Sequence, residues 1–264
     1  MRPTQQQKAE DFRALHDRGV FIIPNPWDAG SARVFEALGF RALATTSSGF
    51  AFTLGREDGG ATLDEVFEHV RLLDRSTSLP VSVDLENGYG PEPEAAAAAI
   101  TQAAEAGAVG GSIEDYGPEL EAIYCLDHAV ARVAAAVEAA RRLSFPFTLT
   151  ARAENHIRGN PQLEDTITRL QAYEQAGADV LYAPGLSSVD EIRAVCEATS
   201  KPLNVLARPT LTAAEIAEAG ARRISVGGAL TWVAIGAMVE AAEKIRDDGD
   251  FSALKVPAQS KGWA

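Results

Sequence analysis

Short apolar stretches alternate with longer amphipathic stretches along almost the whole chain. The short ones have the length and β-branched content of buried strands, and the longer ones, rich in alanine and glutamate, have the spacing of helices. The predicted strands are residues 20–23, 42–46, 81–85, 111–114, 147–151, 180–182, 203–206 and 224–226. The predicted helices between them include residues 92–106, 122–142 and 161–176. The pattern therefore predicts eight successive strand–helix units.

Four of the predicted helices run into a turn that contains glycine, at Gly39, Gly107, Gly177 and Gly220. Glycine just past a helix end can adopt the left-handed conformation without a side-chain clash. We therefore expect helices to stop at these positions. The repetition favours one continuous (β/α)8 barrel over two domains.

The expected fold class is α/β, with a single (β/α)8 TIM barrel over residues 1–264. An extra N-terminal helix is expected in residues 1–19, and a C-terminal tail in residues 250–264. An open doubly wound sheet is the alternative. No Gly-x-Gly-x-x-Gly motif follows the first predicted strand and no polar linker divides the chain, so the barrel is favoured.

Composition narrows the classes of function. The chain has 264 residues, of which 46% are hydrophobic, so it can bury a large core. Its 37 acidic and 24 basic residues give a net charge of -13, which disfavours nucleic acid and anionic membrane as partners. The N-terminus lacks an apolar signal core, and no run approaches the roughly 20 apolar residues of a membrane span. We expect a soluble, cytoplasmic protein.

The two cysteines, Cys125 and Cys196, are far apart and fall in predicted helices. Neither a disulfide framework nor a zinc-binding set is plausible with this spacing. Both are expected to be buried free thiols.

Charged side chains follow three of the predicted strands. Asp84 and Glu86 follow the third strand, Glu114 the fourth and Arg152 the fifth. Alternate residues of an extended segment share one face, so Asp84 and Glu86 are expected to point at one site. The carboxyl ends of barrel strands meet at one mouth, and crowded carboxylates repel unless a cation offsets them. Their oxygens suit Mg²⁺, with Mn²⁺ as the alternative; structural ion pairs are the other interpretation.

Two loops at the same end carry candidate binding groups. Residues 45–50, which include Ser48 and Gly49, form a small polar turn whose hydroxyls and N–H groups could bind a carboxylate or a developing oxyanion. An ordinary Ser/Gly turn is the alternative. Residues 53–60, which include Asp58, have the glycines of a lid that closes over a ligand, or of a plain surface loop.

Several single residues at strand ends are further candidates. Trp27 and Asp28 end the first strand and could shape the pocket, although Asp28 could equally cap the helix that follows. Tyr182 and Asn204 end the sixth and seventh strands and belong either to the cavity or to the core. Arg208 could supply a second contact to an anion.

These motifs together resemble the isocitrate lyase and phosphoenolpyruvate mutase superfamily. They are Asn25-Pro-Trp-Asp28-Ala-Gly-Ser-Ala, Ser48-Gly49, Leu54-Gly-Arg-Glu-Asp58, Asp84-x-Glu86-x-Gly-Tyr-Gly, Ser112-Ile-Glu114-Asp115 and Ala151-Arg152. The likeness runs in order from about residue 20 to 230. It implies a (β/α)8 barrel, commonly oligomeric, in which a neighbour exchanges its last helix, and which binds Mg²⁺ with 2-oxo acids or their enolates.

Carried over residue by residue, the resemblance implies a set of roles. The metal set is Asp84, Glu86 and Glu114, acting directly or through water, with Glu86 at a position where the family usually has aspartate. The substrate set is Trp27, Ser48, Gly49, Asp84, Arg152 and Asn204. The catalytic set is Asp58 on the gating loop, Arg152 and Glu114.

The chain departs from the pattern of this superfamily after the fourth strand. Lyases of this family have a Lys-Lys/Arg-Cys-Gly-His loop there, whereas this chain has Glu114-Asp-Tyr-Gly-Pro-Glu-Leu-Glu-Ala-Ile-Tyr124-Cys125. Cys125 lacks the basic flank that lowers a thiol pKa. The Lys-Thr-Asn-Ser pattern of phosphonopyruvate enzymes is also missing. Both departures argue against transferring a named reaction.

The function expected is that of a Mg²⁺-dependent lyase or decarboxylase that acts on a small 2-oxo acid or related diacid through an enolate. A phosphonopyruvate-type mutase or hydrolase, similar to carboxyvinyl-carboxyphosphonate phosphorylmutase, is the alternative, as is a weakly catalytic barrel that binds a 2-oxo acid. The expected partners are a small anionic substrate and further copies of the chain, as a dimer or tetramer, with no nucleic acid and no membrane.

Overall fold

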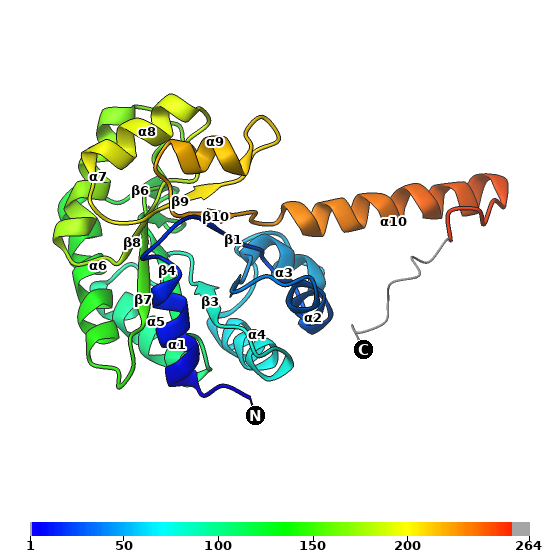
Figure 1. Ribbon diagram of the computed structural model, residues 1–264, viewed down its shortest axis with the longest axis horizontal. Helices are drawn as coiled ribbons and strands as arrows, with labels where there is room; N and C mark the ends of the chain where they lie inside the picture. The colour runs from blue at the N-terminus through cyan, green and yellow to red at the C-terminus, as the bar shows by residue number, and fades with distance from the viewer. Residues whose placement is uncertain (1, 255–264) are drawn as a thin grey trace.

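Eight parallel strands form one sheet in the computed structural model, which describes residues 2–254 (Figure 1). The strands are β1 (Phe21–Ile23), β2 (Leu43–Ala44), β3 (Val81–Asp84), β4 (Gly110–Glu114), β7 (Thr148–Arg152), β8 (Val180–Tyr182), β9 (Leu203–Leu206) and β10 (Arg223–Ser225). Their order is β1-β10-β9-β8-β7-β4-β3-β2. At the remaining seam, the Ala44 N–H donates to the Pro24 carbonyl at 3.1 Å. The sheet is therefore a nearly closed barrel, which confirms the predicted fold class over the open sheet.

Helices surround the barrel, as predicted from the alternating pattern (Figure 1). They are α1 (Gln5–Ala14), α2 (Ala29–Ala37), α3 (Ser47–Thr53), α4 (Leu63–Ser76), α5 (Pro93–Glu105), α6 (Leu126–Arg141), α7 (Leu163–Gln175), α8 (Val189–Ala198), α9 (Ala213–Glu218) and α10 (Ala229–Asp248). A small hairpin of β5 (Tyr116–Gly117) and β6 (Ala122–Ile123) follows β4.

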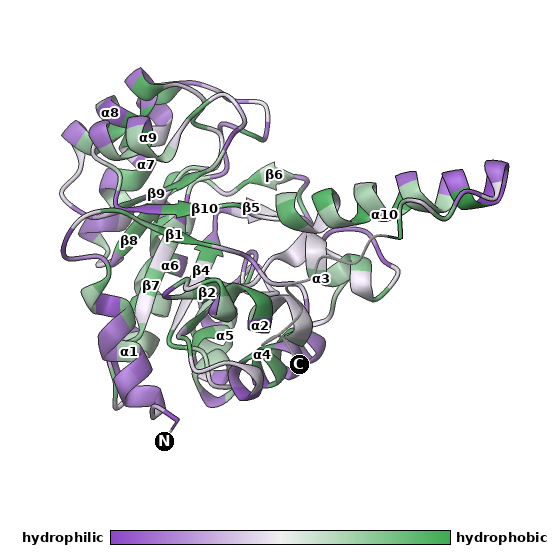
Figure 2. Cartoon of the chain, turned by 45° about the vertical axis from the view of Figure 1, so that its right-hand side comes forward, coloured by the Kyte–Doolittle hydropathy of each residue, from purple (hydrophilic) through white to green (hydrophobic). Residues whose placement is uncertain are grey.

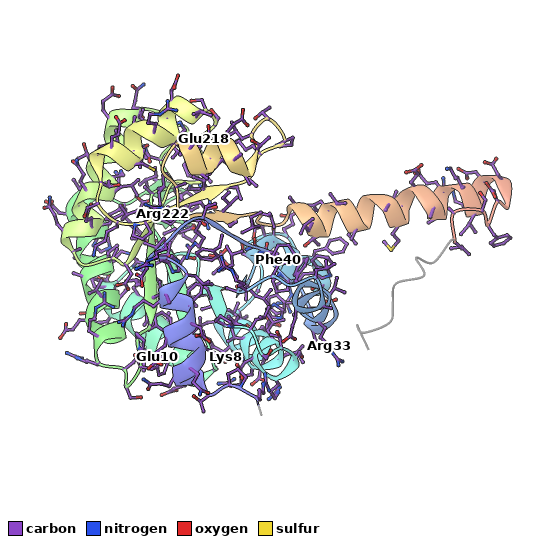
Figure 3. The ribbon with its side chains drawn as sticks, viewed as in Figure 1. Lys8, Glu10, Arg33, Phe40, Glu218 and Arg222 are labelled. Atoms are coloured by element: carbon purple, nitrogen blue, oxygen red, sulfur yellow. The ribbon has the colours of Figure 1, made fainter. Side chains whose placement is uncertain are left out.

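The expected N-terminal helix is α1, which packs beneath the barrel. Phe12 lies against Phe21 of β1, with ring centroids 6.4 Å apart. On the same helix, the ammonium of Lys8 (labelled in Figure 3) lies 2.8 Å from the Asp74 carboxylate of α4. Helix α1 is thus fixed by both apolar packing and an ion pair.

The four predicted helix stops are confirmed. Gly39, Gly107, Gly177 and Gly220 have φ values of +85°, +109°, +101° and +108°, in the region that favours glycine. Each follows the last residues of a helix and turns the chain toward the next strand.

The apolar core lies outside the sheet, between strands and helices. Val83 of β3 packs with Ile100 of α5, and Val205 of β9 packs with Ile192 of α8. The alternate positions of the same strands, such as Ser82 and Asn204, face the barrel interior and are polar. The interior therefore holds a polar cavity beneath the mouth.

Two expectations from the sequence are wrong. Residues 122–125 are not helical, because Ala122–Ile123 pair with Tyr116–Gly117, and Cys125 is the residue before the first turn of α6. Cys125 is consequently exposed and Cys196 is partly exposed, so neither thiol is fully buried.

Helix α10 packs against α3 only at its start, where Trp232 meets Phe52 with ring centroids 5.2 Å apart, and the rest of the helix projects away from the barrel (Figure 1). Its barrel-proximal part is apolar and its far end is hydrophilic (Figure 2). Within residues 2–254, no helix has both the length and the apolar composition of a membrane-spanning segment. Most of the predicted tail, residues 255–264, lies outside the described residues, and the assignment of a single domain stays a prediction.

Candidate active site

A cavity of about 390 Å³ opens at the carboxyl ends of the strands. Its lining includes Ser48, Asp58, Asp84, Arg152, Tyr182 and Asn204, which sequence reasoning had placed at or near the site. Ser112, Arg208, Arg223 and Ser225 line it as well. The barrel thus brings together side chains that are up to about 180 residues apart in sequence.

Arg152 is the centre of the charged cluster at the mouth. Its Nη1 lies 3.2 Å from Oε2 of Glu114 and 3.6 Å from Oδ1 of Asp84, and its Nε contacts Glu154. Burial opposes the charged form of Arg152, but the carboxylates of Glu114, Glu154 and Asp84 outweigh burial and raise its pKa. Arg152 is therefore a permanent cation shared by three acids.

Glu114 and Glu154 are both buried, at 7% and 0% side-chain exposure. Desolvation raises the pKa of each carboxyl, and neighbouring carboxylates raise it further, whereas Arg152 acts in the opposite direction. Arg158 also contacts Glu154, at 3.3 Å, and stacks 3.7 Å above the Tyr116 ring. Glu114 does not line the cavity itself and meets it through Arg152.

Asp84 is held so that one oxygen is engaged and the other is available. Its N–H donates to Thr45 Oγ1 at 2.8 Å, and its Oδ1 accepts from Ser112 Oγ at 3.3 Å and from the Glu86 N–H at 3.2 Å. Oδ2 accepts no hydrogen bond from the described residues. Asp84 is thus an oriented carboxylate with a free oxygen at the cavity.

Glu86 does not share the strand face of Asp84. Strand β3 ends at Asp84, and the chain then turns, with the Gly88 N–H donating to the Leu85 carbonyl at 2.7 Å. Glu86 has φ of +48°, so the alternation assumed from the sequence is wrong there. Its carboxylate accepts from the Tyr89 hydroxyl at 3.0 Å. Burial and the nearby Asp84 raise its pKa to about 7.

Residues 45–50 are not a simple turn, since α3 begins within them. Thr46 caps α3 by accepting from the Gly49 N–H, and its hydroxyl lies 3.3 Å from that of Ser48. Ser48 lines the cavity, but Gly49 is buried behind it. A Cβ at Gly49 would lie 2.6 Å from Thr231 Oγ1 of α10, so close packing requires glycine there.

The segment 53–60 places Asp58 at the cavity. The segment is held at its base by Arg56, whose Nη1 lies 2.7 Å from Glu65 Oε2 and 3.1 Å from the Gly60 carbonyl. Movement of this segment as a lid stays a prediction.

The residues that follow the first strand mainly support the fold around the cavity. Asp28 caps α2, accepting from the Ser31 N–H at 2.6 Å, as one of the two interpretations expected. Trp27 packs on Phe35 and does not line the cavity. Asn25, which begins one of the motifs of the resemblance but had no predicted role, joins three strand ends through Thr45, Val226 and Gly227.

The donor set fits a divalent cation. The cluster contains four carboxyl groups and two guanidinium groups, so its formal charge is minus two. The acids are Asp84, Glu86, Glu114 and Glu154, and the cations are Arg152 and Arg158. Within residues 2–254, no three His, Cys, Asp or Glu side chains are grouped closely enough to hold a metal on their own. Mg²⁺ commonly keeps several waters and takes few protein ligands, so Asp84 with water-bridged acids suits it.

Fold and site together define an α/β-barrel protein with a cluster of carboxyl and guanidinium groups at the carboxyl-terminal mouth of the barrel. A family model described as phosphoenolpyruvate phosphomutase matches residues 12–246. The chain therefore belongs to the phosphoenolpyruvate mutase/isocitrate lyase superfamily.

Two curated relatives are similar over most of the chain. The chain is 32% identical over 208 residues to an oxaloacetate decarboxylase of Bradyrhizobium diazoefficiens, covering 73% of this chain and 70% of the relative. It is 28% identical over 265 residues to a 2-methylisocitrate lyase of Halalkalibacterium halodurans, covering 93% and 84%.

Solved structures agree with this placement. A Burkholderia cenocepacia J2315 protein, described provisionally as a lyase/mutase, is 52% identical with a TM-score of 0.93, covering 97% of this chain and 94% of that one. Phosphonopyruvate hydrolase in complex with oxalate and Mg²⁺ is 25% identical with a TM-score of 0.85, covering 96% and 92%. Oxaloacetate acetylhydrolase with its product oxalate is 27% identical with a TM-score of 0.85, covering 95% and 89%.

Proposed function

We propose that the chain is a Mg²⁺-dependent lyase or decarboxylase that acts on a small 2-oxo acid or related diacid through an enolate. The observation that carries the proposal is the cluster around Arg152, where an oriented Asp84 carboxylate borders a polar cavity and carboxyl groups outnumber guanidinium groups. Such a cluster supplies both a cation site and a fixed guanidinium for an anionic substrate.

In this proposal the side chains at the mouth bind and orient the substrate. Asp84, Glu114 and Glu86 would hold the ion, and Arg152 would contact an anionic oxygen of the substrate. The Ser48 hydroxyl at the cavity wall donates to the substrate carboxylate, with the Gly49 segment shaping that wall. Asp58 closes the open side, and Asn204 and Tyr182 line the opposite wall.

Bond cleavage beside a carbonyl group leaves an electron pair that must be accommodated as an enolate. When bound, Mg²⁺ supplies the Lewis acid that polarises the 2-oxo group and lowers this barrier. Arg152 and Ser48 are preorganised donors to the same anion, so they add stabilisation without reorganisation.

Decarboxylation is the reaction that needs the fewest further groups. The enolate left after loss of carbon dioxide can be protonated by solvent, so no protein acid of the cysteine type is required. Cys125 does not line the cavity, and the loop that precedes it forms the β5–β6 hairpin. The similarity to oxaloacetate decarboxylases supports this choice among lyases.

The alternatives are P–C chemistry on a phosphonopyruvate-type substrate and binding of a 2-oxo acid without turnover. Similarity to phosphonopyruvate hydrolase favours P–C chemistry, against which stands the loop sequence after β4. A barrel that binds a 2-oxo acid without turnover needs the same cluster but no reaction. Binding of oxalate without conversion of any substrate would identify that case.

We also infer that the enzyme is a homo-oligomer, as a dimer or tetramer. Helix α10 exposes Trp232, Val233 and Met238 at 49%, 66% and 58%. On the barrel, Ile22 of β1 is 40% exposed on the outer face of the sheet, where barrel strands are normally covered by a helix. Two apolar surfaces that residues 2–254 leave exposed favour association between copies. A cytoplasmic location stays a prediction.

The test of the proposed function is turnover by the purified protein with Mg²⁺. Oxaloacetate, 2-alkylmalates and phosphonopyruvate are offered separately, and pyruvate or the corresponding 2-oxo acid is measured. Release of carbon dioxide from oxaloacetate is expected, with loss of the reaction when Mg²⁺ is chelated. No turnover of any of these compounds would contradict the proposal.

A further inference from the structure

Arg223 of β10 is buried at the inner end of the cavity. It is 5% exposed and lies among the lining residues. Its Nε donates to Asn204 Oδ1 at 2.8 Å, and its Nη2 donates to Thr150 Oγ1 at 3.0 Å. Its Nη1 lies 3.4 Å from Nε2 of His16, in the turn that follows α1. Three elements therefore hold the guanidinium inside the barrel.

None of these partners is an acid. Arg223 forms no ion pair with any residue from 2 to 254, whereas Arg152 touches three carboxylates. Burial and the nearby Arg223 hold the pKa of His16 at about 3, so His16 is neutral. Burial lowers the pKa of Arg223 to about 10, and a guanidinium is still charged at neutral pH. The inner end of the cavity thus carries a positive charge that no side chain offsets.

The guanidinium also has donors to spare. Five N–H bonds are available on arginine, and three acceptors are in place. A planar guanidinium with unused N–H bonds is suited to a carboxylate, which would supply both acceptors and the missing charge.

The cavity connects this cation with the cluster at the mouth. Thr150, which accepts from Arg223, precedes Arg152 by two residues on β7, so Thr150 and Arg152 lie on the same face of that strand, ~7 Å apart along it. The wall between them carries small side chains, Ala44, Ser82 and Ser112. A short carbon chain that extends along the barrel axis can therefore reach both ends.

We propose that Arg223 forms an inner subsite that binds the terminal carboxylate of a 2-oxo diacid whose 2-oxo carboxylate end lies at the mouth. This inference rests on the proposed function, because it takes the mouth as the site of the 2-oxo acid. The proposal adds a specificity to that function: Arg223, in the barrel interior beneath the mouth, selects diacids over monoacids of equal length.

The subsite is tested by calorimetry with a matched pair of ligands in the presence of Mg²⁺. The ligands are 2-oxoglutarate and 2-oxopentanoate, which have the same chain and differ in the terminal carboxylate. The wild-type protein is expected to prefer 2-oxoglutarate by at least about tenfold. In Arg223→Met this preference is lost, while the affinity for 2-oxopentanoate stays within about twofold.

A second variant tests the charge while keeping the shape. Asn204→Asp places a carboxylate on the Nε of Arg223 and neutralises it in place, so the same loss of preference is expected even where Arg223→Met does not fold. An unchanged preference in either folded variant, or an equal loss for both ligands in Arg223→Met, overturns the subsite.

Oxalate, which spans only the mouth, separates the subsite from the proposed function. A wild-type protein that binds oxalate with Mg²⁺ but does not distinguish the two 2-oxo acids contradicts the subsite alone. A protein that binds neither oxalate nor a 2-oxo acid contradicts the proposed function, and the subsite with it.

Discussion

Glu114 and Arg152 are register partners on the adjacent strands β4 and β7, and their side chains meet at 3.2 Å. This pairing places one guanidinium where Asp84 and Glu154 also reach it. The register of β4 and β7 therefore assembles the charged cluster, and a substitution of Arg152 removes the contacts of three acids.

Replacement of Arg152 by lysine keeps the charge and removes the planar fork. Because one ammonium cannot reproduce contacts to Asp84, Glu114 and Glu154, kcat/KM is expected to fall by about 100-fold. Steady-state kinetics on the substrate found by the turnover assay measures this. Arg193→Lys, at an exposed ion pair with Asp190, is the matched control and should leave kcat/KM unchanged. Equal activity of Arg152→Lys and wild type would contradict the role of Arg152.

Arg132 of α6 holds the loop that follows β3. Its guanidinium donates to the carbonyls of Asn87, Gly90, Pro91 and Glu92, and it is 1% exposed. Arg132→Met leaves these carbonyls without their donor, so the free energy of unfolding should fall by ~3 kcal/mol in denaturant titration.

The control for Arg132 is Arg142→Met, which removes an exposed pair with Glu138 near the end of the same helix. Its effect should stay within ~0.5 kcal/mol. Since Glu86 precedes the clamped loop, Arg132→Met should also weaken Mg²⁺-dependent oxalate binding. A variant with wild-type stability would show that the carbonyls do not depend on Arg132.

His69 of α4 is expected to make the protein sensitive to acid. Its ring stacks on Phe50 at 4.1 Å, its Nε2 has no hydrogen-bond partner among the described residues, and burial lowers its pKa to about 4. The unfolded chain protonates near 6.5, so between pH 6.5 and 4 it binds a proton that the folded state excludes. The His69 contribution to stability is therefore lost as pH falls through this window, at ~1.4 kcal/mol per pH unit.

His69→Phe keeps the ring against Phe50 and removes the titrating group. At pH 5 the variant should gain ~2 kcal/mol over wild type, relative to the same difference at pH 7.5. Thermal unfolding at the two pH values measures this, with Leu72→Phe on the exposed side of α4 as control. If the gain does not depend on pH, protonation of His69 does not limit stability in acid.

The exposed face of α10 should govern assembly. Val233→Glu introduces a charge at a position that is 66% exposed in a single chain. In a monomer this substitution would change the free energy of unfolding little. We expect a smaller particle for the variant than for wild type in light scattering at equal concentration. Glu240→Lys, farther along the exposed face, serves as the control. The same mass for wild type and Val233→Glu, with both monomeric, would contradict oligomerisation.

Much of the barrel could be predicted from the sequence because its signals are local. Apolar strand runs and helix-ending glycines such as Gly107 and Gly177 repeat once per unit, and each depends on nearby residues alone. The strand bounds agreed to within a few residues. The hairpin at 116–123 was missed, because a strand of two residues has too short an alternation to recognise.

The position of a side chain at the barrel mouth was predictable where the residue stands on a regular strand, as Asp84, Glu114 and Arg152 do. The prediction failed at Glu86, where a positive φ replaces the extended geometry that it assumed. Glu154 was signalled by its spacing of two residues from Arg152, which places it beside the guanidinium. Arg223 had no such signal. Its partners Asn204 and Thr150 lie on other strands, so the sequence alone does not show that no acid faces the guanidinium.

The central claim, that Asp84 anchors a divalent cation for an anionic 2-oxo acid, is tested most directly by oxalate binding. Calorimetry is performed on wild type and Asp84→Asn, with Mg²⁺ and with a chelator. We expect wild type to bind oxalate only with Mg²⁺, and the isosteric Asp84→Asn variant to bind at least about 100-fold more weakly at unchanged fold. Unchanged affinity in Asp84→Asn, or equal binding by wild type in the chelator, would contradict the account.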